Sequence, residues 1–124
     1  MEPFTVKTSR VVMSADANYD GNLFGGRLLE WFDELAGITA KRFTHSDIVT
    51  AAVNDINFLH PMPLGSFLDL TAQVVHVGNS SLKIKITVMM DTDYREDTQI
   101  QTAEATFIFV AVDKNGKTHK IQRG

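Results

Sequence analysis

The 124-residue sequence contains no cysteine, which excludes disulfide bonds, thiolate catalysis and zinc or iron–sulfur sites built on cysteine. Glycine and proline are scarce, at eight and three residues, so a collagen-like or low-complexity chain is excluded. Basic residues number 12 against 15 acidic ones, and this lack of basic excess argues against a dedicated nucleic-acid-binding protein. No apolar run approaches the roughly 18 residues of a membrane-spanning helix.

What is present fits one globular domain over residues 1–124. The apolar fraction is 44% and the charged fraction 22%, values that are ordinary for a folded domain with a real core. The opening Met1–Glu2–Pro3 has neither the basic nor the apolar region of a signal peptide, so we expect a cytoplasmic protein.

One long helix is predicted between residues 23 and 43. Leu28, Phe32 and Leu35 recur with helical spacing, and Trp31 and Ile38 lie on the flank of this apolar stripe. Because apolar residues would then cover most of its circumference, the helix is predicted to be mostly buried. Alternating hydrophobicity predicts strands at residues 4–13, 68–74 and 82–88, and runs rich in apolar residues predict strands at 48–58 and 102–112. Loops are expected at 14–22 and 78–81, and a polar connection at 91–97.

These elements predict an α+β fold. One helix cannot cover a parallel sheet, and the strands are joined mostly by hairpin-like connections. The expected architecture is therefore an antiparallel sheet that folds around the single helix.

Asp33 is the candidate base of a catalytic site. Its helical neighbours Leu29, Ala36 and Gly37 are small or apolar, whereas Glu34 falls in the charged stripe. Small residues allow a ligand or another backbone to come close, and a carboxylate there would be partly withdrawn from water, which suits a general base. The other interpretation is that Asp33 marks the edge of the polar face; periodicity leaves both open.

The start of the helix is the second candidate feature. Gly25 and Gly26 fall in its first turn, where glycine costs stability relative to alanine. Either the helix start packs tightly on a strand, or a ligand approaches its free backbone N–H groups, which can stabilise an oxyanion. Asn18, a few residues upstream, either forms a turn or orients a water molecule or a carbonyl group.

The last twelve residues carry an excess of basic charge. Lys114, Lys117, Lys120 and Arg123 stand against Asp113 alone. The segment is either a solvated basic tail or a surface that contacts phosphate groups.

Two blocks, residues 18–26 (NYDGNLFGG) and 28–36 (LLEWFDELA), resemble the signature of hotdog-fold acyl-CoA thioesterases, in particular the broad-range bacterial acyl-CoA hydrolases. Similar blocks follow in the family's order at residues 49–51, 57–65, 77–81 and 109–113. The resemblance implies a hotdog fold, in which a curved antiparallel sheet wraps around one long helix. It also implies hydrolysis of acyl-CoA to free fatty acid and CoA, with no metal and no cofactor beyond the CoA of the substrate.

For the active site, the resemblance implies that Asp33 acts as general base or nucleophile and that Asn18 positions the water or the thioester carbonyl. It assigns the carbonyl-polarising N–H groups to the turn at Gly25 and Gly26, and it places Thr50 near the base. A loop of Gly78, Asn79, Ser80 and Ser81 would contact CoA. The resemblance further implies homodimers paired sheet to sheet, with Asn18 of one chain and Asp33 of the other in each site, and hexamers of three dimers.

Two alternatives and one departure accompany this resemblance. A hydroxyacyl dehydratase of the same fold needs a histidine close to the helix start, and none precedes His45, so dehydration is not expected. A non-catalytic acyl-CoA sensor would use the same pocket without turnover, but the presence of Asn18 and Asp33 argues against it. The sequence ends soon after Arg123, so we expect it to lack the longer tail that closes over CoA in some members, and to hold the nucleotide less tightly.

Overall fold

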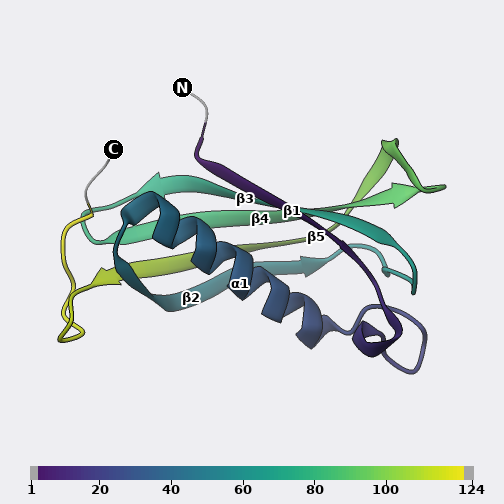
Figure 1. The fold of residues 1–124 in the computed structure, drawn as a ribbon, viewed down its shortest axis with the longest axis horizontal. Helices are drawn as coiled ribbons and strands as arrows, with labels where there is room; N and C mark the ends of the chain where they lie inside the picture. The colour runs from purple at the N-terminus through teal and green to yellow at the C-terminus, as the bar shows by residue number, and fades with distance from the viewer. Residues whose placement is uncertain (1–2, 122–124) are drawn as a thin grey trace.

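The computed structural model describes residues 3–121 and contains one long helix and one antiparallel sheet (Figure 1). The elements are β1 (Thr5–Val11), a short 3-10 helix (Ser14–Asp16), α1 (Gly25–Thr44), β2 (Asp47–Phe58), β3 (Phe67–Val77), β4 (Ser81–Thr92) and β5 (Arg95–Val112). The strand order is β1-β3-β4-β5-β2, and every neighbouring pair is antiparallel. The sheet curves around α1, which confirms the predicted α+β hotdog architecture.

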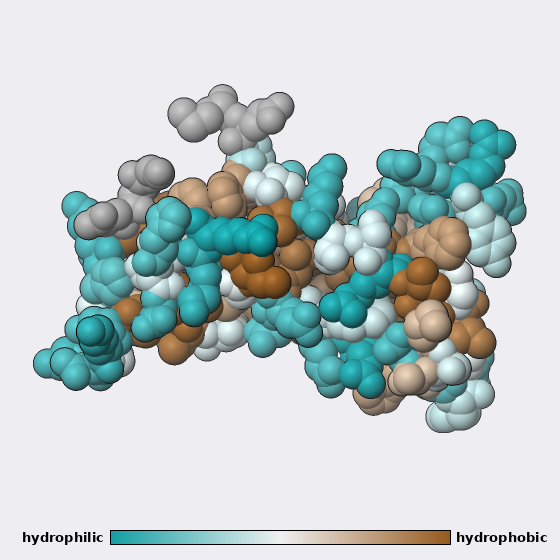
Figure 2. Space-filling model, viewed as in Figure 1, coloured by the Kyte–Doolittle hydropathy of each residue, from teal (hydrophilic) through white to brown (hydrophobic). Residues whose placement is uncertain are grey.

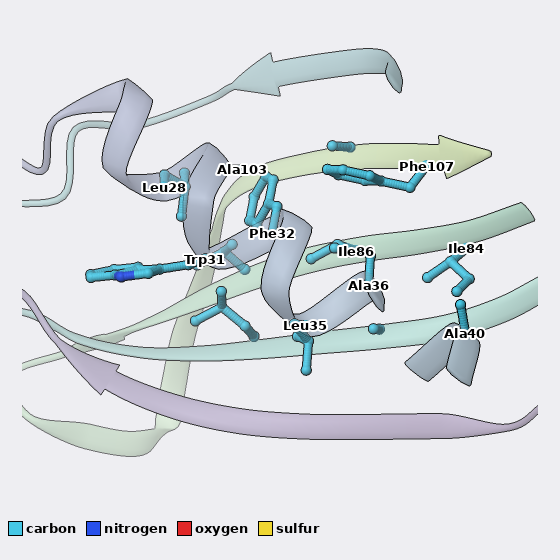
Figure 3. Close-up of a cluster of buried hydrophobic side chains, with 14 of the residues drawn as sticks. Leu28, Trp31, Phe32, Leu35, Ala36, Ala40, Ile84, Ile86, Ala103 and Phe107 are labelled. Carbon is cyan, nitrogen blue, oxygen red and sulfur yellow. The ribbon is translucent and has the colours of Figure 1, made fainter. Parts of the chain in front are cut away.

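The core lies between α1 and the inner face of the sheet (Figure 3). Leu28, Phe32 and Ala36 project from the helix and are fully buried, as are Ile84 and Ile86 on β4. The helix residues recur at a spacing of four, and the strand residues at a spacing of two, so each element presents one apolar face to the other. The apolar residues of the alternating pattern that predicted β3 and β4 therefore form the inward face of the sheet.

The helix is buried along one side only, contrary to the prediction that it would be mostly buried. Ile38 is 43% exposed, and Asp33, on the other flank of the helix, is exposed as well. A Cβ added at Gly37 would meet nothing within 4 Å. The reason is that a single five-stranded sheet covers one face of the helix, so no second layer within residues 3–121 packs on the outward side, which is reached only by side-chain contacts such as those of Asp33 with Thr50 and of Glu34 with Arg10.

The polar connection predicted for residues 91–97 is also wrong. Strands β4 and β5 continue through this segment, and only Asp93 and Tyr94 form the turn between them, with φ of 53° and 56°. Positive φ at both central residues matches the right-handed twist of a hairpin. Because this ribbon projects beyond the core (Figure 1), its residues need no apolar alternation, and the hydrophobic pattern could not reveal them as strands.

Polar contacts hold the projecting ribbon together. The Gln99 side-chain amide donates a hydrogen bond of 2.8 Å to Asp91 on the neighbouring strand, and the Tyr94 ring packs edge-on against Phe67. Beside the turn, the Arg95 guanidinium lies 2.9 Å from Asp97 and lowers the pKa of that carboxyl.

One edge of the sheet, β2, is long and apolar. Ile48 and Ala52 are its half-buried residues, and the rest of the strand is exposed; Val49, Val53, Ile56 and Phe58 are between 36% and 53% exposed. An edge strand with free N–H and C=O groups and apolar side chains is a template for pairing with another strand. Among the described residues, α1 and the other helical segment are too short or too polar to span a bilayer.

Thr102 carries a buried hydroxyl without a partner, and this generates a stability prediction. It is the residue that β5 inserts between the pairs Val88–Ala103 and Met89–Gln101. Its side chain is fully buried, and Oγ1 has no hydrogen-bond partner within residues 3–121. Since an unsatisfied buried hydroxyl costs about 1–3 kcal/mol, Thr102→Val should raise the free energy of unfolding by about 1 kcal/mol, measured by urea denaturation at fixed protein concentration.

Thr39 supplies the matched control. Its buried hydroxyl donates a 2.8 Å hydrogen bond to the carbonyl of Leu35, so Thr39→Val should lower the free energy of unfolding by about 1 kcal/mol. Equal losses in the Thr39 and Thr102 variants would contradict the assignment of an unsatisfied group at Thr102.

Candidate active site

Asn18 organises the loop that precedes α1. Its Oδ1 accepts hydrogen bonds from the backbone N–H groups of Asp20, at 3.0 Å, and Asn22, at 3.2 Å. Its own backbone N–H donates to the carbonyl of Asn22, at 2.8 Å. Asn18 is therefore a turn-forming residue, and the Nδ2 group has no acceptor within residues 3–121. Because Oδ1 is already engaged, Asn18 can act on a ligand only as a donor to an oxygen atom.

The first turn of α1 presents unsatisfied backbone donors. The N-cap residue Phe24 makes no side-chain capping bond, and the turn contains no acidic residue. The first helical hydrogen bond runs from the N–H of Leu28 to the carbonyl of Phe24, at 3.1 Å. The N–H groups of Gly25, Gly26 and Arg27 have no acceptor within residues 3–121. These groups form the positive end of the helix dipole and can receive a negatively charged oxygen.

The two glycines of this turn have different neighbours. A Cβ added at Gly26 would lie 2.6 Å from Cε1 of the Phe24 ring, which is too close. A Cβ added at Gly25 would lie 3.7 Å from Cζ of Phe58, an ordinary contact. The Phe24 ring is 57% exposed and can move aside, so this contact does not by itself require glycine at residue 26. At Gly25 packing does not demand glycine, and its absent side chain leaves room beside the Phe58 ring.

Asp33 and Thr50 come together across the gap between α1 and β2. Thr50 Oγ1 donates a hydrogen bond of 3.3 Å to Asp33 Oδ1. Both side chains are exposed, so the expectation that Asp33 would be partly withdrawn from water is wrong for the single chain. The physical reason is that this side of α1 lies next to the free edge strand β2, where no further element covers it.

The structure does not bring Asp33 to the helix start of its own chain. With a rise of 1.5 Å per residue, Asp33 lies about 12 Å along α1 from Gly25. A water molecule that attacks a carbonyl must lie about 3 Å from both the carboxylate and the carbonyl carbon. Within a single chain, the helix-start donors next to Asn18 are therefore too far from Asp33 to act on the same carbonyl group.

A hollow of about 320 Å³ opens beside the helix start. Leu23 and Met62 are its buried residues and Phe58 and Leu59 are exposed at its rim; the full lining is Leu23, Gly25, Phe58, Leu59, His60, Pro61 and Met62. Apolar surface, brown in Figure 2, gathers at this end of the molecule. A larger hollow of about 680 Å³ lies on the outer face of β1 and β3, and its lining includes none of the predicted site residues.

Sequence reasoning missed the residues that follow β2 in this hollow. In the sequence, Phe58, Leu59 and Met62 fall at the end of a predicted strand and in the proline-containing segment that follows it. Only the folded chain brings them next to the helix start. His60 also lines the hollow beside Gly25. The absence of histidine from the first 43 residues therefore does not keep a histidine away from the helix start, and that argument against dehydration fails.

The predicted CoA loop lies at the opposite end of the sheet. Gly78 N–H donates to the Ser81 carbonyl at 2.8 Å, which closes the hairpin between β3 and β4. The carbonyls of Asn79 and Ser80 accept from Ile121 and Ala111, at 2.8 and 2.9 Å. The chain after β5 is thus anchored on this loop (Figure 1).

The basic segment that follows β5 shares this end of the molecule. Lys114, Lys117 and Lys120 are exposed, while a bridge between Val112 and Thr118 fixes their backbone. The segment is therefore not a free tail as far as residue 121. Arg123 lies outside the described residues.

The chain contains backbone donors for an oxyanion at the helix start, a carboxylate on an accessible helix face and an apolar hollow. An enzyme that transfers an acyl group to water needs these three features. Comparison with known proteins agrees with this class. Residues 20–96 match the family model of the thioesterase superfamily. A Haemophilus influenzae protein named an uncharacterised acyl-CoA thioester hydrolase is 36% identical over 115 residues, which cover 91% of this chain and 75% of the relative.

Further relatives and solved structures give the same result. An acyl-CoA thioester hydrolase of Salmonella typhimurium is 36% identical over 109 residues, covering 86% of this chain and 82% of the relative. An acyl-CoA hydrolase from Staphylococcus aureus, solved with butyryl-CoA and CoA, superposes with a TM-score of 0.87 at 30% identity, covering 98% of this chain and 71% of that one. A hexameric thioesterase from Yersinia pestis gives 0.85 at 32% identity, covering 94% of both chains. The chain belongs to the thioesterase superfamily.

The two hydrogen bonds that Asn18 Oδ1 accepts allow its structural role to be tested apart from its donor group. Asn18→Ala removes both bonds and should lower the free energy of unfolding by about 1 kcal/mol. Asn18→Asp keeps two acceptor oxygens and should remain within about 0.5 kcal/mol of the wild type. Urea denaturation of both variants provides the measurement, and an equal loss in the two would contradict a loop held through Oδ1.

Proposed function

We propose that this protein hydrolyses acyl-CoA thioesters to a free carboxylic acid and CoA. The observation that carries the proposal is the uncapped start of α1, whose free N–H groups open beside an apolar hollow, in a chain of the thioesterase superfamily. A thioester carbonyl needs oxyanion stabilisation, and its acyl chain needs an apolar slot. The complex of a relative with butyryl-CoA supports this substrate class.

In the proposed mechanism the thioester oxygen accepts hydrogen bonds from the N–H groups of Gly25 and Gly26. The Asn18 Nδ2 group donates to the attacking water or to the same oxygen. Asp33 takes a proton from the water, which attacks the carbonyl carbon, and the tetrahedral intermediate expels the CoA thiolate. Asp33 then returns the proton to the thiolate. One water is consumed, one acid and one thiol are formed, and no cofactor is required.

Two copies of the chain are needed to assemble this site. The free edge of β2 can pair with β2 of a second copy, and such a pair is antiparallel when a two-fold axis relates the copies. In full overlap, Thr50 of one copy lies opposite Asp55 of the other, close to the end of β2 where Phe58 and Gly25 line the same hollow. The Asp33–Thr50 pair of one copy then lies beside the helix start of the other.

The same pairing supports two further parts of the proposal. It covers the exposed side of α1, so Asp33 would be withdrawn from water in the dimer although it is exposed in one chain. It also reverses one copy relative to the other, so the loop from Gly78 to Ser81 of one copy approaches the helix start of its partner. That loop and the nearby lysines would then contact the CoA of a thioester bound there.

Solved relatives support both the assembly and the residue roles. Three of them are hexameric thioesterases, and we propose a hexamer of three such dimers here. Structures of the Staphylococcus aureus enzyme include single alanine variants at an asparagine, an aspartate and a threonine. Those three residues are spaced along their chain as Asn18, Asp33 and Thr50 are along this one. The spacing supports Thr50 as the residue that orients Asp33.

Replacing Asp33 tests the reaction and its base. Asp33→Asn preserves size and hydrogen bonding but cannot accept the proton, so kcat should fall by at least about a hundred-fold, with the circular dichroism spectrum and elution volume unchanged. The measurement is free-thiol release from a panel of acyl-CoAs by both proteins.

The panel also separates the alternatives. Wild-type activity retained in Asp33→Asn would show that another group is the base. Binding of acyl-CoA without thiol release would identify a sensor, and loss of water from a 3-hydroxyacyl-CoA would identify the dehydratase that His60 brings back into consideration.

Mixing two inactive variants tests whether each site spans two chains. Asn18→Asp and Asp33→Asn should each be inactive alone. In a co-expressed mixture, half of the dimers combine one chain of each kind and contain one site with both wild-type residues, so about a quarter of wild-type activity should return. No recovery in a mixture shown by mass spectrometry to contain mixed dimers would place Asn18 and Asp33 of one chain in the same site.

A further inference from the structure

The hollow beside the helix start has a packed side and an exposed side. Its buried side is formed by Leu23 and Met62, which are 7% and 4% exposed and belong to the core. Its outer side is formed by exposed residues that include Phe58, the last residue of β2, and Leu59, which are 53% and 48% exposed. The hollow is thus fixed on one side by packed residues and bounded on the other by exposed side chains, of which Phe58 is the one next to Gly25.

The Phe58 ring reaches the place where the reacting group would lie. The position of a Cβ at Gly25 is 3.7 Å from Phe58 Cζ, and the Gly25 N–H is one of the free donors of the first turn. An acyl chain whose carbonyl binds these donors therefore begins within a few ångströms of the ring. The backbone of Phe58 is paired with Ala103 of β5, so an ordered strand carries the ring.

The size of the hollow limits what it can hold. Water occupies about 30 Å³ per molecule in the liquid, and a methylene group is of similar size. A hollow of about 320 Å³ therefore has the volume of a chain of roughly ten carbons. Each methylene buried there strengthens binding about four-fold, and a longer chain must displace the ring or extend into water.

We propose that Phe58 determines the acyl chain length, closing the hollow so that short- and medium-chain acyl-CoAs are favoured over long-chain ones. The inference rests on the proposed function, because it assigns the acyl group of that reaction to this hollow. It makes Phe58 a specificity-determining residue with no part in proton transfer.

The test compares kcat/KM across a series of saturated acyl-CoAs for wild type, Phe58→Ala and Phe58→Trp. Removing the ring should extend the accepted chain by roughly two to four carbons, the volume of the lost ring. The ratio of kcat/KM for myristoyl-CoA over hexanoyl-CoA should then rise at least about ten-fold. Phe58→Trp should lower the same ratio, and it remains informative if the alanine variant fails to assemble.

Ile56→Ala is the matched control. Ile56 lies on the same strand with 38% exposure but does not line the hollow, so its variant reports any effect of an altered β2 edge. The ratio should stay within about two-fold of wild type in this control. Elution volumes of all variants establish that the assembly is unchanged.

Each contrary outcome has a distinct meaning. Equal changes at every chain length in both Phe58 variants, or the same shift in Ile56→Ala, would overturn the assignment of Phe58 while wild-type activity upholds the proposed function. Absence of thiol release by the wild type from every acyl-CoA would overturn the proposed function itself.

Discussion

The structure depends on the burial of one side of α1 against the curved inner face of the sheet. Leu28, Phe32 and Ala36 meet a face of β4 and β5 that would otherwise expose its apolar side chains to water. The five-stranded sheet packs against one side of α1 and does not extend around to the other side. The same packing that stabilises the chain therefore leaves one helix face, and with it Asp33, open to the outside.

This open helix face lies next to the free edge of the sheet, and the two form one continuous unsatisfied surface. The hydrogen bond between Thr50 and Asp33 joins them. A strand edge with apolar side chains and unpaired backbone groups is stabilised by pairing, and a carboxylate near it gains a less aqueous environment in the same step. Because no second layer covers α1 and β2 in the single chain, the same surface that folding leaves open is the surface on which the site would assemble.

The sequence was sufficient for the fold but not for the whole site. Helical periodicity located the helix, and alternating or continuous apolar patterns located all five strands. Strands β3, β4 and β5 place buried apolar residues in the core, and β1 and β2 carry apolar residues that pack against it. The ribbon at Asp93 and Tyr94 was not predicted because it has no buried face. The exposure of Ile38 was not predicted because periodicity does not show which parts of an apolar stripe are covered. Phe58 and His60 reach Gly25 only through the return of β2 along α1, a contact between distant segments that local patterns do not contain.

The separation of Asp33 from the helix start within one chain has a chemical logic. A carboxylate in the first turn of a helix satisfies the free N–H groups there and neutralises the positive end of the dipole. The first turn of α1 contains no acidic residue, and about 12 Å of helix keeps Asp33 from reaching it. The donors of a single chain therefore stay unoccupied. When a second chain supplies the carboxylate, its position is set by strand pairing and not by attraction to those donors, so it can face the water while the N–H groups remain free for the thioester oxygen.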